Sequence, residues 1–437
     1  TLAWHAAETA RALGGGNHAD VATTLNYPLQ MQAEALAARA SSQFVDGSQV
    51  ALLVVDISTR DVLASVGAAD RQAPGGWIDL TNRKRSPGST LKPFIYGLAF
   101  DDGIAAPATR IQDAPRRFAS YRPDNFDRMF RGDVTVAEAL QHSLNVPAVA
   151  ALDAIGPRRF LSSLEFAGAH PSLPVSAESD DGLAVALGGV GLTARDLAVL
   201  YAALGDGGKA RPLNWLADRP KRKKPERPLT IMTPESASEI IDILRRAPTP
   251  QGRMPARLTQ QAPEIAFKTG TSYGYRDAWA AGVGDGLAIV VWTGRADSAP
   301  RTATTGREDA LPILFEAFDL AARILPKTAS GPVLRHDLRD RPTPRPMASF
   351  ESDARPPQIL FPPTEAELWV DERHRSFVMA AEGRGRLDWY VEGRPLSRNA
   401  AGEAVWFPET PGFYKIAVVD ADGRTTRSSV RVRTPEQ

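Results

Sequence analysis

Two groups of strand-like sequence, far apart in the chain, constrain the fold more than any other feature. Residues 48–68 contain two apolar stretches that flank Ser58–Asp61, which predicts a β-hairpin with a buried first strand. Residues 266–295 read as further strands joined by glycine-containing turns, and helical patterns dominate residues 89–204 between the two groups. We expect the outer strands to pair into one sheet with the helices packed on it, which is an α+β fold.

The remainder of the chain divides by composition. The first 45 residues are helical in pattern, with WHAAETARAL and LQMQAEALAARASSQF separated by a GGGN break. Residues 329–357 are rich in Pro, Arg and Asp and poor in large apolar residues, which is typical of a linker. Residues 358–437 contain short strand patterns with hairpin turns at Glu392–Gly393 and Asp422–Gly423. We therefore expect a small all-β domain there, a β-sandwich of immunoglobulin type.

Composition and motif content exclude several classes of function. The net charge is +1, so no overall field attracts the chain to nucleic acid or to a membrane surface. The chain has no cysteine, which excludes disulfides, thiolate metal sites and a cysteine nucleophile. Its six histidines show no zinc-binding spacing, and there is no phosphate-binding loop or dinucleotide fingerprint. We expect neither a metal nor another cofactor. No stretch reaches the roughly 20 apolar residues of a membrane span.

A serine and a lysine open the apolar run RSPGSTLKPFIYGLAF. Ser89 follows a Pro-Gly turn, which predicts that a helix begins there, and Lys92 lies one turn later on the same face. A serine hydroxyl is a poor nucleophile unless a base takes its proton, and a lysine is a base only when neutral. Burial, a nearby positive charge and the positive end of a helix dipole all lower the pKa of a lysine. Taken alone, the pattern more often marks an N-cap serine followed by a lysine that reaches solvent.

A second polar pair occurs in SLNVPA, which we expect to form a loop between helices. Ser143 and Asn145 flank Leu144, so the hydroxyl and the amide can face a cleft while the leucine anchors the loop. The hydroxyl can relay a proton to a leaving nitrogen, and the amide can hold a peptide carbonyl or accept from a lysine. Taken alone, Ser-x-Asn is more often a turn or an N-cap.

A third motif occurs in FKTGTSYG, which we expect at the start of a strand. Its residues are Lys268, Thr269, Gly270, Thr271 and Ser272. The lysine and the two threonine hydroxyls suit a carboxylate, and glycine in a strand often marks the close approach of a ligand or another backbone. Backbone N–H groups along such an edge can pair with an extended peptide. The alternative is an exposed edge strand that its lysine protects from association.

The three motifs occur in the order Ser-x-x-Lys, Ser-x-Asn and Lys-Thr-Gly, the signature of penicillin-binding proteins and β-lactamases. From about residue 48 to 325 the chain resembles the penicillin-binding transpeptidases, and NRKRSPGSTLKPFIYGLAF and LGGVGLTARDLAVLYAALGDGG are similar to blocks of the bifunctional class A members. The resemblance implies a transpeptidase domain over residues 46–328, with an antiparallel sheet and packed helices as in serine β-lactamases.

The resemblance also implies the context of the chain. Residues 1–45 would be a linker segment from an upstream glycosyltransferase domain, because TTLNYPLQMQAEALA is similar to the segment that joins the two enzyme domains of that family. A membrane anchor would hold the full-length protein on the periplasmic side of the inner membrane, while the present residues are expected to be soluble.

For the catalytic groups, the resemblance implies that Ser89 attacks the D-Ala-D-Ala amide of a peptidoglycan stem peptide and becomes acylated. Lys92 would be its base, and Ser143 would pass the proton to the departing D-alanine. Asn145 would orient the substrate and Lys92. Lys268 would supply positive potential. β-Lactam antibiotics would acylate the same serine.

For substrate binding, the resemblance implies that Thr269 and Thr271 hold the terminal carboxylate, with Gly270 and Ser272 in the same strand. The backbone N–H groups of Ser89 and Thr271 would form the oxyanion hole. Loss of one such donor typically costs about 2.7–4 kcal/mol of transition-state stabilisation.

Several functions remain open. A class A β-lactamase uses a glutamate-directed water to clear the acyl-enzyme, and no Glu-x-x-Leu-Asn segment lies between Asn145 and Lys268. We therefore expect slow hydrolysis, with an amine acceptor resolving the intermediate. The alternatives to a D,D-transpeptidase are a D,D-carboxypeptidase and a catalytically weak, β-lactam-binding scaffold or sensor. In the scaffold, the C-terminal β domain would bind a cell-wall protein partner.

Overall fold

The computed structural model describes twelve segments of the chain and divides into two compact units. The described residues are 4–13, 21–118, 121–173, 182–217, 229–253, 263–301, 305–326, 356–370, 375–383, 385–399, 401–421 and 425–434. The first unit contains residues 1–107, 140–143 and 148–344, and the second contains residues 108–139, 144–147 and 345–437. The expected linker lies outside the described residues up to residue 355. Within the described residues, no helix is both long and apolar enough to cross a bilayer.

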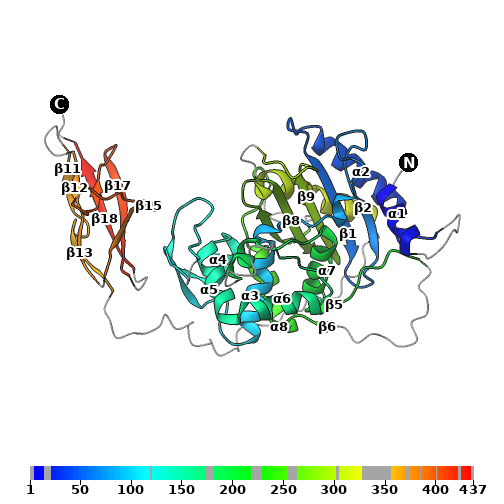
Figure 1. Cartoon of the computed structure of the whole chain (residues 1–437), viewed down its shortest axis with the longest axis horizontal. Coiled ribbons are helices and arrows are strands. Elements are labelled where there is room, and N and C mark those ends of the chain that lie inside the picture. Colours follow the sequence, from blue (N-terminus) through cyan, green and yellow to red (C-terminus); the bar gives the residue numbers. More distant parts are fainter. Residues whose placement is uncertain are drawn as a thin grey trace. The chain divides into compact units, whose positions relative to one another are not determined.

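An antiparallel five-stranded sheet forms the centre of the first unit (Figure 1), in the order β2-β1-β9-β8-β7. The strands are β1 (Gln49–Asp56), β2 (Val62–Val66), β7 (Ala266–Thr271), β8 (Asp277–Gly284) and β9 (Leu287–Gly294). β1 pairs with β9 along its whole length, from Gln49 opposite Gly294 to Asp56 opposite Leu287. The prediction that the two distant strand groups share one sheet is confirmed.

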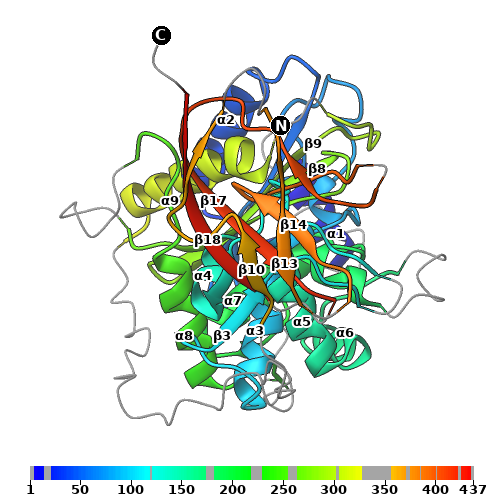
Figure 2. The same cartoon turned by 90° about the vertical axis from the view of Figure 1, so that its left-hand side faces the viewer.

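Helices cover both faces of this sheet. α2 (Tyr27–Ser41) and α9 (Leu311–Ile324) lie side by side on one face (Figure 2). They share a core with alternate β1 residues, Val50, Leu52 and Val54. α7 (Ala194–Gly205) contacts β1, β8 and β9, and its buried residues include Leu197 and Leu200. Since both faces are covered, β1 reads as a continuous apolar run rather than as an alternating one.

The other helices of the described residues are shorter than α2 and α9. They are α1 (Trp4–Leu13), α3 (Lys92–Asp101), α4 (Val136–Gln141), α5 (Asn145–Ile155), α6 (Pro157–Phe166) and α8 (Pro234–Arg245). Shorter turns are η1 (Leu80–Asn82), η2 (Gly88–Leu91), η4 (Leu183–Leu187) and the π-helical η6 (Gly306–Ala310). β5 (Lys209–Ala210) and β6 (Leu229–Thr230) form a small ladder.

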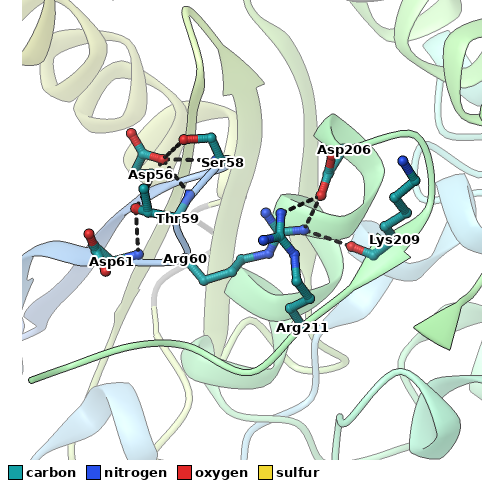
Figure 3. A network of polar contacts seen from close by, with 8 residues as sticks. All are labelled: Asp56, Ser58, Thr59, Arg60, Asp61, Asp206, Lys209 and Arg211. Carbon is teal, nitrogen blue, oxygen red and sulfur yellow. Dashed lines mark hydrogen bonds and ion pairs between the residues drawn. The ribbon is translucent and has the colours of Figure 1, made fainter. Parts of the chain in front are cut away.

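The turn of the β1–β2 hairpin is tied to the end of α7 through a buried arginine (Figure 3). Asp56 accepts hydrogen bonds from the backbone N–H groups of Ser58 and Thr59, each at 2.8 Å. Arg60 then adopts a φ of 65°, and its side chain is only 1% exposed. Its guanidinium donates to Asp206 at 3.0 Å and to the carbonyl of Lys209 at 2.6 Å. Burial, with a smaller effect of the nearby Arg211 charge, lowers the pKa of Arg60 to about 10.

The second unit contains a short hairpin and the C-terminal all-β domain. The hairpin pairs β3 (Arg110–Asp113) with β4 (Gly132–Thr135). The C-terminal domain has a five-stranded sheet in the order β11-β18-β17-β14-β15 and two further strand pairs, β10-β13 and β12-β16. These strands are β10 (Gln358–Phe361), β11 (Glu367–Trp369), β12 (Phe377–Val378), β13 (Ala380–Glu382), β14 (Asp388–Val391), β15 (Arg394–Pro395), β16 (Val405–Trp406), β17 (Gly412–Val419) and β18 (Thr425–Arg433).

The C-terminal strands enclose a core of their own, which confirms the predicted all-β domain. Trp389, Trp406 and Ile416 are buried in it. The predicted β14–β15 turn is present at Glu392 and Gly393, which have φ values of 49° and 75°. Positive φ at both central residues is characteristic of a two-residue hairpin turn. The β17–β18 hairpin is also present, but its predicted turn at residues 422–423 lies outside the described residues.

Candidate active site

The segment that carries Ser89 is a tight 3₁₀ turn rather than the first turn of an α-helix. η2 spans Gly88–Leu91, and α3 begins at Lys92, whose N–H donates to the carbonyl of Ser89. The prediction that the helix begins at Ser89 is therefore wrong by three residues. Pro93 explains the difference, because it has no N–H with which to make the α-type bond to the Ser89 carbonyl.

Three glycines allow this turn to pack directly against strand β7 and its surroundings. A Cβ atom on Gly88 would lie 2.6 Å from the backbone N and O of Thr271, and one on Gly270 would lie 2.2 Å from the carbonyl O of Pro87. On the far side, a Cβ atom on Gly188 would lie 2.4 Å from the N of Gly88. The expected close approach at Gly270 is thus an approach of another backbone. It places Ser89 next to the Lys-Thr-Gly strand.

Lys92 is completely buried at the start of α3. Its Nζ donates a hydrogen bond of 2.7 Å to the backbone carbonyl of Ser143. This contact joins the first motif to the second, although 51 positions separate the two residues. A buried amine needs such partners, because an unsatisfied one costs several kcal/mol, on the order of 2–7.

Ser143 lies in the short connection between α4 and α5, as predicted for this motif. Its backbone has a φ of 58°, in the left-handed region that non-glycine residues rarely adopt. Such conformations cost roughly 1–3 kcal/mol and cluster at functional sites. The strained backbone directs the carbonyl of Ser143 to Lys92 and its hydroxyl to Lys268.

Lys268 is the third contributor and lies on β7 with 4% of its surface exposed. Its Nζ donates to the Oγ of Ser143 at 2.7 Å and to the carbonyl of Thr269 at 2.9 Å. Burial, helped by the positive charge of Arg307, lowers the pKa of Lys268 from 10.5 to about 7. The amine is therefore poised between its charged and neutral forms near neutral pH, and it can supply the positive potential that the resemblance implies only when it is charged.

β7 is an edge strand, and the Lys-Thr-Gly-Thr residues are its last four, not its first. Thr269 and Thr271 are partly exposed there. The Oγ1 of Thr271 accepts a hydrogen bond of 3.0 Å from the N–H of Gly306 in η6, so the threonine's own proton is left to donate elsewhere. Gly306 fits only because it lacks a side chain, since a Cβ atom would lie 2.3 Å from the Gly270 carbonyl.

Ser272 lies beyond the strand and does not share its environment. It is buried in the turn that leads to β8, where its Oγ accepts a hydrogen bond of 2.8 Å from the N–H of Asp277. Its backbone N–H donates to the Asp277 carbonyl. These bonds indicate that Ser272 closes the β7–β8 turn, unlike the substrate contact expected from the sequence.

Asn145 is the first residue of α5 rather than a loop residue, and it belongs to the second unit. Its Nδ2 donates to the carbonyl of Asp124 at 2.6 Å, and its backbone N–H donates to the Oδ1 of Asn125 at 2.7 Å. The structure therefore brings together Ser89, Lys92, Ser143, Lys268 and Thr271 within the first unit. Asn145 is bonded to residues 124–125 of the second unit.

Sequence reasoning missed the supporting residues of this site. Gly306 and Arg307 lie far from every motif, and Asn125 lies in a segment with no recognisable pattern. The indole Nε1 of Trp279 donates to the carbonyl of Ser86 at 2.8 Å, which fastens β8 to the turn before Ser89. The only sequence signal for these residues is their type, because glycine, asparagine and tryptophan often have structural roles in close packing and hydrogen bonding.

The profile of the penicillin binding protein transpeptidase domain matches residues 50–292, which is more than half of the chain. That match covers the central sheet and all three motifs. The chain belongs to the penicillin-binding transpeptidase family. A second profile, the penicillin-binding protein C-terminus family, matches residues 346–432, which contain the C-terminal β domain.

Curated relatives agree with this assignment. The chain is 39% identical over 324 residues to penicillin-binding protein 1C of Escherichia coli, with 73% of this chain and 40% of that protein covered. It is 29% identical over 291 residues to penicillin-binding protein 1B of Vibrio cholerae, with 60% and 34% covered. The chain thus spans well under half the length of these relatives.

Solved structures share the fold. The chain superposes on PonA1 of Mycobacterium tuberculosis in complex with penicillin V with a TM-score of 0.59 at 20% identity, covering 72% of this chain and 90% of that one. Penicillin-binding protein 1A of Haemophilus influenzae gives a TM-score of 0.52 at 20% identity, covering 63% and 48%.

Proposed function

We propose that this penicillin-binding transpeptidase family member is a D,D-transpeptidase that cross-links peptidoglycan stem peptides through an acyl-enzyme on Ser89. The observation that carries the proposal is the convergence of Lys92 and Lys268 on Ser143. One amine bonds its carbonyl and the other its hydroxyl, each at 2.7 Å. The turn with Ser89 packs on Thr271 beside them. A nucleophile, a base and a proton relay need this proximity.

In the acylation step, the Oγ of Ser89 forms a bond to the carbonyl carbon of the penultimate D-alanine. The hydroxyl proton moves to a neutral Lys92. The carbon–nitrogen bond then breaks, and the Ser143 hydroxyl passes a proton to the departing D-alanine nitrogen. In the second step, an acceptor amine attacks the ester, loses a proton to the same relay and releases Ser89. A β-lactam follows the first step, but its leaving nitrogen stays tethered.

Two further groups support this mechanism. Lys268 in its charged form and the hydroxyl of Thr271 are suited to the terminal carboxylate of the stem peptide or of a penicillin. The backbone N–H groups of Ser89 and Thr271 lie on the two segments that Gly88 and Gly270 allow into contact, and this proximity supports a two-donor oxyanion hole. Because the chain is similar to penicillin-binding protein 1C of Escherichia coli, we expect it to act on the periplasmic side of the inner membrane.

Intact-protein mass after incubation with a penicillin tests the proposal. We expect a stable adduct of one penicillin, absent in Ser89→Ala. Rapid turnover without an adduct would indicate a β-lactamase, and no reaction at all would indicate a silent scaffold. Incubation with muropeptides then separates a transpeptidase, which makes cross-linked dimers, from a D,D-carboxypeptidase, which only releases D-alanine.

The C-terminal domain favours an additional role in binding a cell-wall protein. Trp369, Phe407 and Phe413 are each more than half exposed on it, so aromatic surface is accessible for such a contact. A deletion of residues 346–437 that keeps penicillin acylation but loses co-purification of an envelope protein would support this role.

A further inference from the structure

Asn125 is a buried residue outside the three motifs that holds the start of α5. Its side chain is 4% exposed, and its Oδ1 accepts the N–H of Asn145 at 2.7 Å. The first N–H groups of a helix have no partner inside the helix, so they need an acceptor from elsewhere. Here the acceptor comes from a side chain 20 positions earlier, rather than from a cap residue next to the helix. The start of α5 is therefore fixed by a distant segment.

Asp113 sets the orientation of the Asn125 amide. The Nδ2 of Asn125 donates to both carboxylate oxygens of Asp113, each at 2.8 Å, and to the carbonyl of Met129 at 2.9 Å. All three partners are acceptors, so the NH₂ group must face them and the amide oxygen must face the opposite way, toward Asn145. Asp113 is completely buried at the end of β3 and also accepts the N–H of Arg131 at 2.8 Å.

The side chain of Asn145 is fixed from the same segment. Its Nδ2 donates to the carbonyl of Asp124, the residue before Asn125. Both the backbone and the amide of Asn145 are thus bonded to residues 124–125. Burial raises the pKa of Asp113, although the N–H donors from Arg131 and Asn125 act in the opposite direction.

We propose that Asp113 and Asn125 are positioning residues for transpeptidation, acting on the reacting groups through Asn145. The pair sets the point at which α5 begins and the direction of the Asn145 amide. The inference rests on the proposed function, because it assigns to Asn145 the substrate-orienting role of the second motif. Neither residue touches the substrate in this scheme.

The rate constant for acylation by a fluorescent penicillin, measured per active molecule, tests the inference. Asn125→Ala removes the acceptor for Asn145, and we expect acylation to slow roughly 10- to 100-fold, the scale of a small misplacement of a reacting group. A purely structural role would lower the thermal unfolding midpoint and the labelled fraction but leave that rate constant unchanged. An unchanged rate constant would overturn the inference.

An exchange of the two side chains provides the rescue. Asn125→Asp alone places a second carboxyl against Asp113 and should slow acylation as much as Asn125→Ala. Combining it with Asp113→Asn restores an amide–carboxylate pair and an acceptor for the Asn145 N–H. We expect the double variant to regain at least a tenth of the wild-type rate constant. A double variant no faster than Asn125→Asp would contradict the proposed pairing.

Asp133→Asn is the matched control. It makes the same chemical change on the same hairpin, but it removes only the exposed ion pair with Arg110 at 2.6 Å. We expect wild-type acylation from this variant. If the wild-type protein itself forms no adduct on Ser89, the proposed function fails. If it forms the adduct and Asn125→Ala forms it equally fast, only the present inference fails.

Discussion

The amine of Lys268 and the hydroxyl of Ser143 are hydrogen-bonded at 2.7 Å although 125 positions separate them in the chain. This bond joins the second and third motifs inside a site that is closed enough to bring the pKa of Lys268 to about 7. A lysine in this state can hold a carboxylate when protonated and can exchange a proton with the serine when it is not. Its charge state should therefore be visible in the kinetics.

The first prediction concerns pH. In the enzyme without ligand, the pKa of Lys268 is lowered to about 7, so the amine is mainly charged below that pH and mainly neutral above it. The second-order rate constant for acylation by an anionic penicillin reports the free enzyme, and we expect it to fall by up to about tenfold per pH unit above pH 7. A penicillin methyl ester has no carboxylate, so its acylation rate constant should not show this decrease above pH 7. The prediction is wrong if both compounds give the same profile from pH 6 to 9.

The second prediction concerns the close contact between β7 and the Ser89 turn. Gly270→Ala places a methyl group 2.2 Å from the carbonyl O of Pro87, so the turn must move away from the strand. We expect acylation to slow by roughly 100-fold. Gly282→Ala on the neighbouring strand is the control, because its methyl group would meet no atom closer than 3.1 Å. Equal rates in the two variants would show that the contact is not needed for acylation.

The third prediction concerns the bond from Gly306 to Thr271. Gly306→Ala forces η6 away from β7, which removes the donor to the threonine hydroxyl. We expect penicillin to bind roughly tenfold more weakly before acylation, with a smaller change in the acylation step. Since the effect acts through the hydroxyl, Gly306→Ala should add little in a Thr271→Val background. Fully additive losses in this double-mutant cycle would contradict the connection.

The fourth prediction concerns stability. Asp206→Ala leaves the buried guanidinium of Arg60 without its carboxylate, and we expect the free energy of unfolding to fall by about 3 kcal/mol, the lower end for a broken buried pair. Arg211→Ala removes a more exposed ion pair to the same aspartate and should cost under about 1 kcal/mol. Urea unfolding measures both. Equal losses would mean that the burial of Arg60 adds nothing to the pair.

The sequence predicts the parts of this fold that depend on apolar pattern. The strands at residues 49–66 and 266–294 are long apolar runs bounded by turn residues, and their pairing follows from the need to bury both faces of one sheet. The hairpin at Glu392–Gly393 follows from turn chemistry that acts over a few residues. Local rules are sufficient for these elements.

Most of the errors and omissions come from contacts between distant residues, and the start of α3 is an exception. The start of α3 at Lys92 depends on Pro93, a local signal that the apolar run obscures. The role of Gly306 depends on a strand about 35 positions earlier in the chain. The role of Asn125 depends on a helix that begins 20 positions later. The pKa of Lys268 depends on how completely the packed site excludes water. Motif spacing contains none of this information.

The pairing of β1 with β9 has a consequence for how the protein is made. β1 obtains its second neighbour only after residues 287–294 have been synthesised, and β7 with Lys268 reaches the sheet only through β8 and β9. A nascent chain that has just exposed Ser89 and Lys92 therefore still lacks Lys268. The bond from Lys268 to Ser143 forms only after the last strands have completed the sheet.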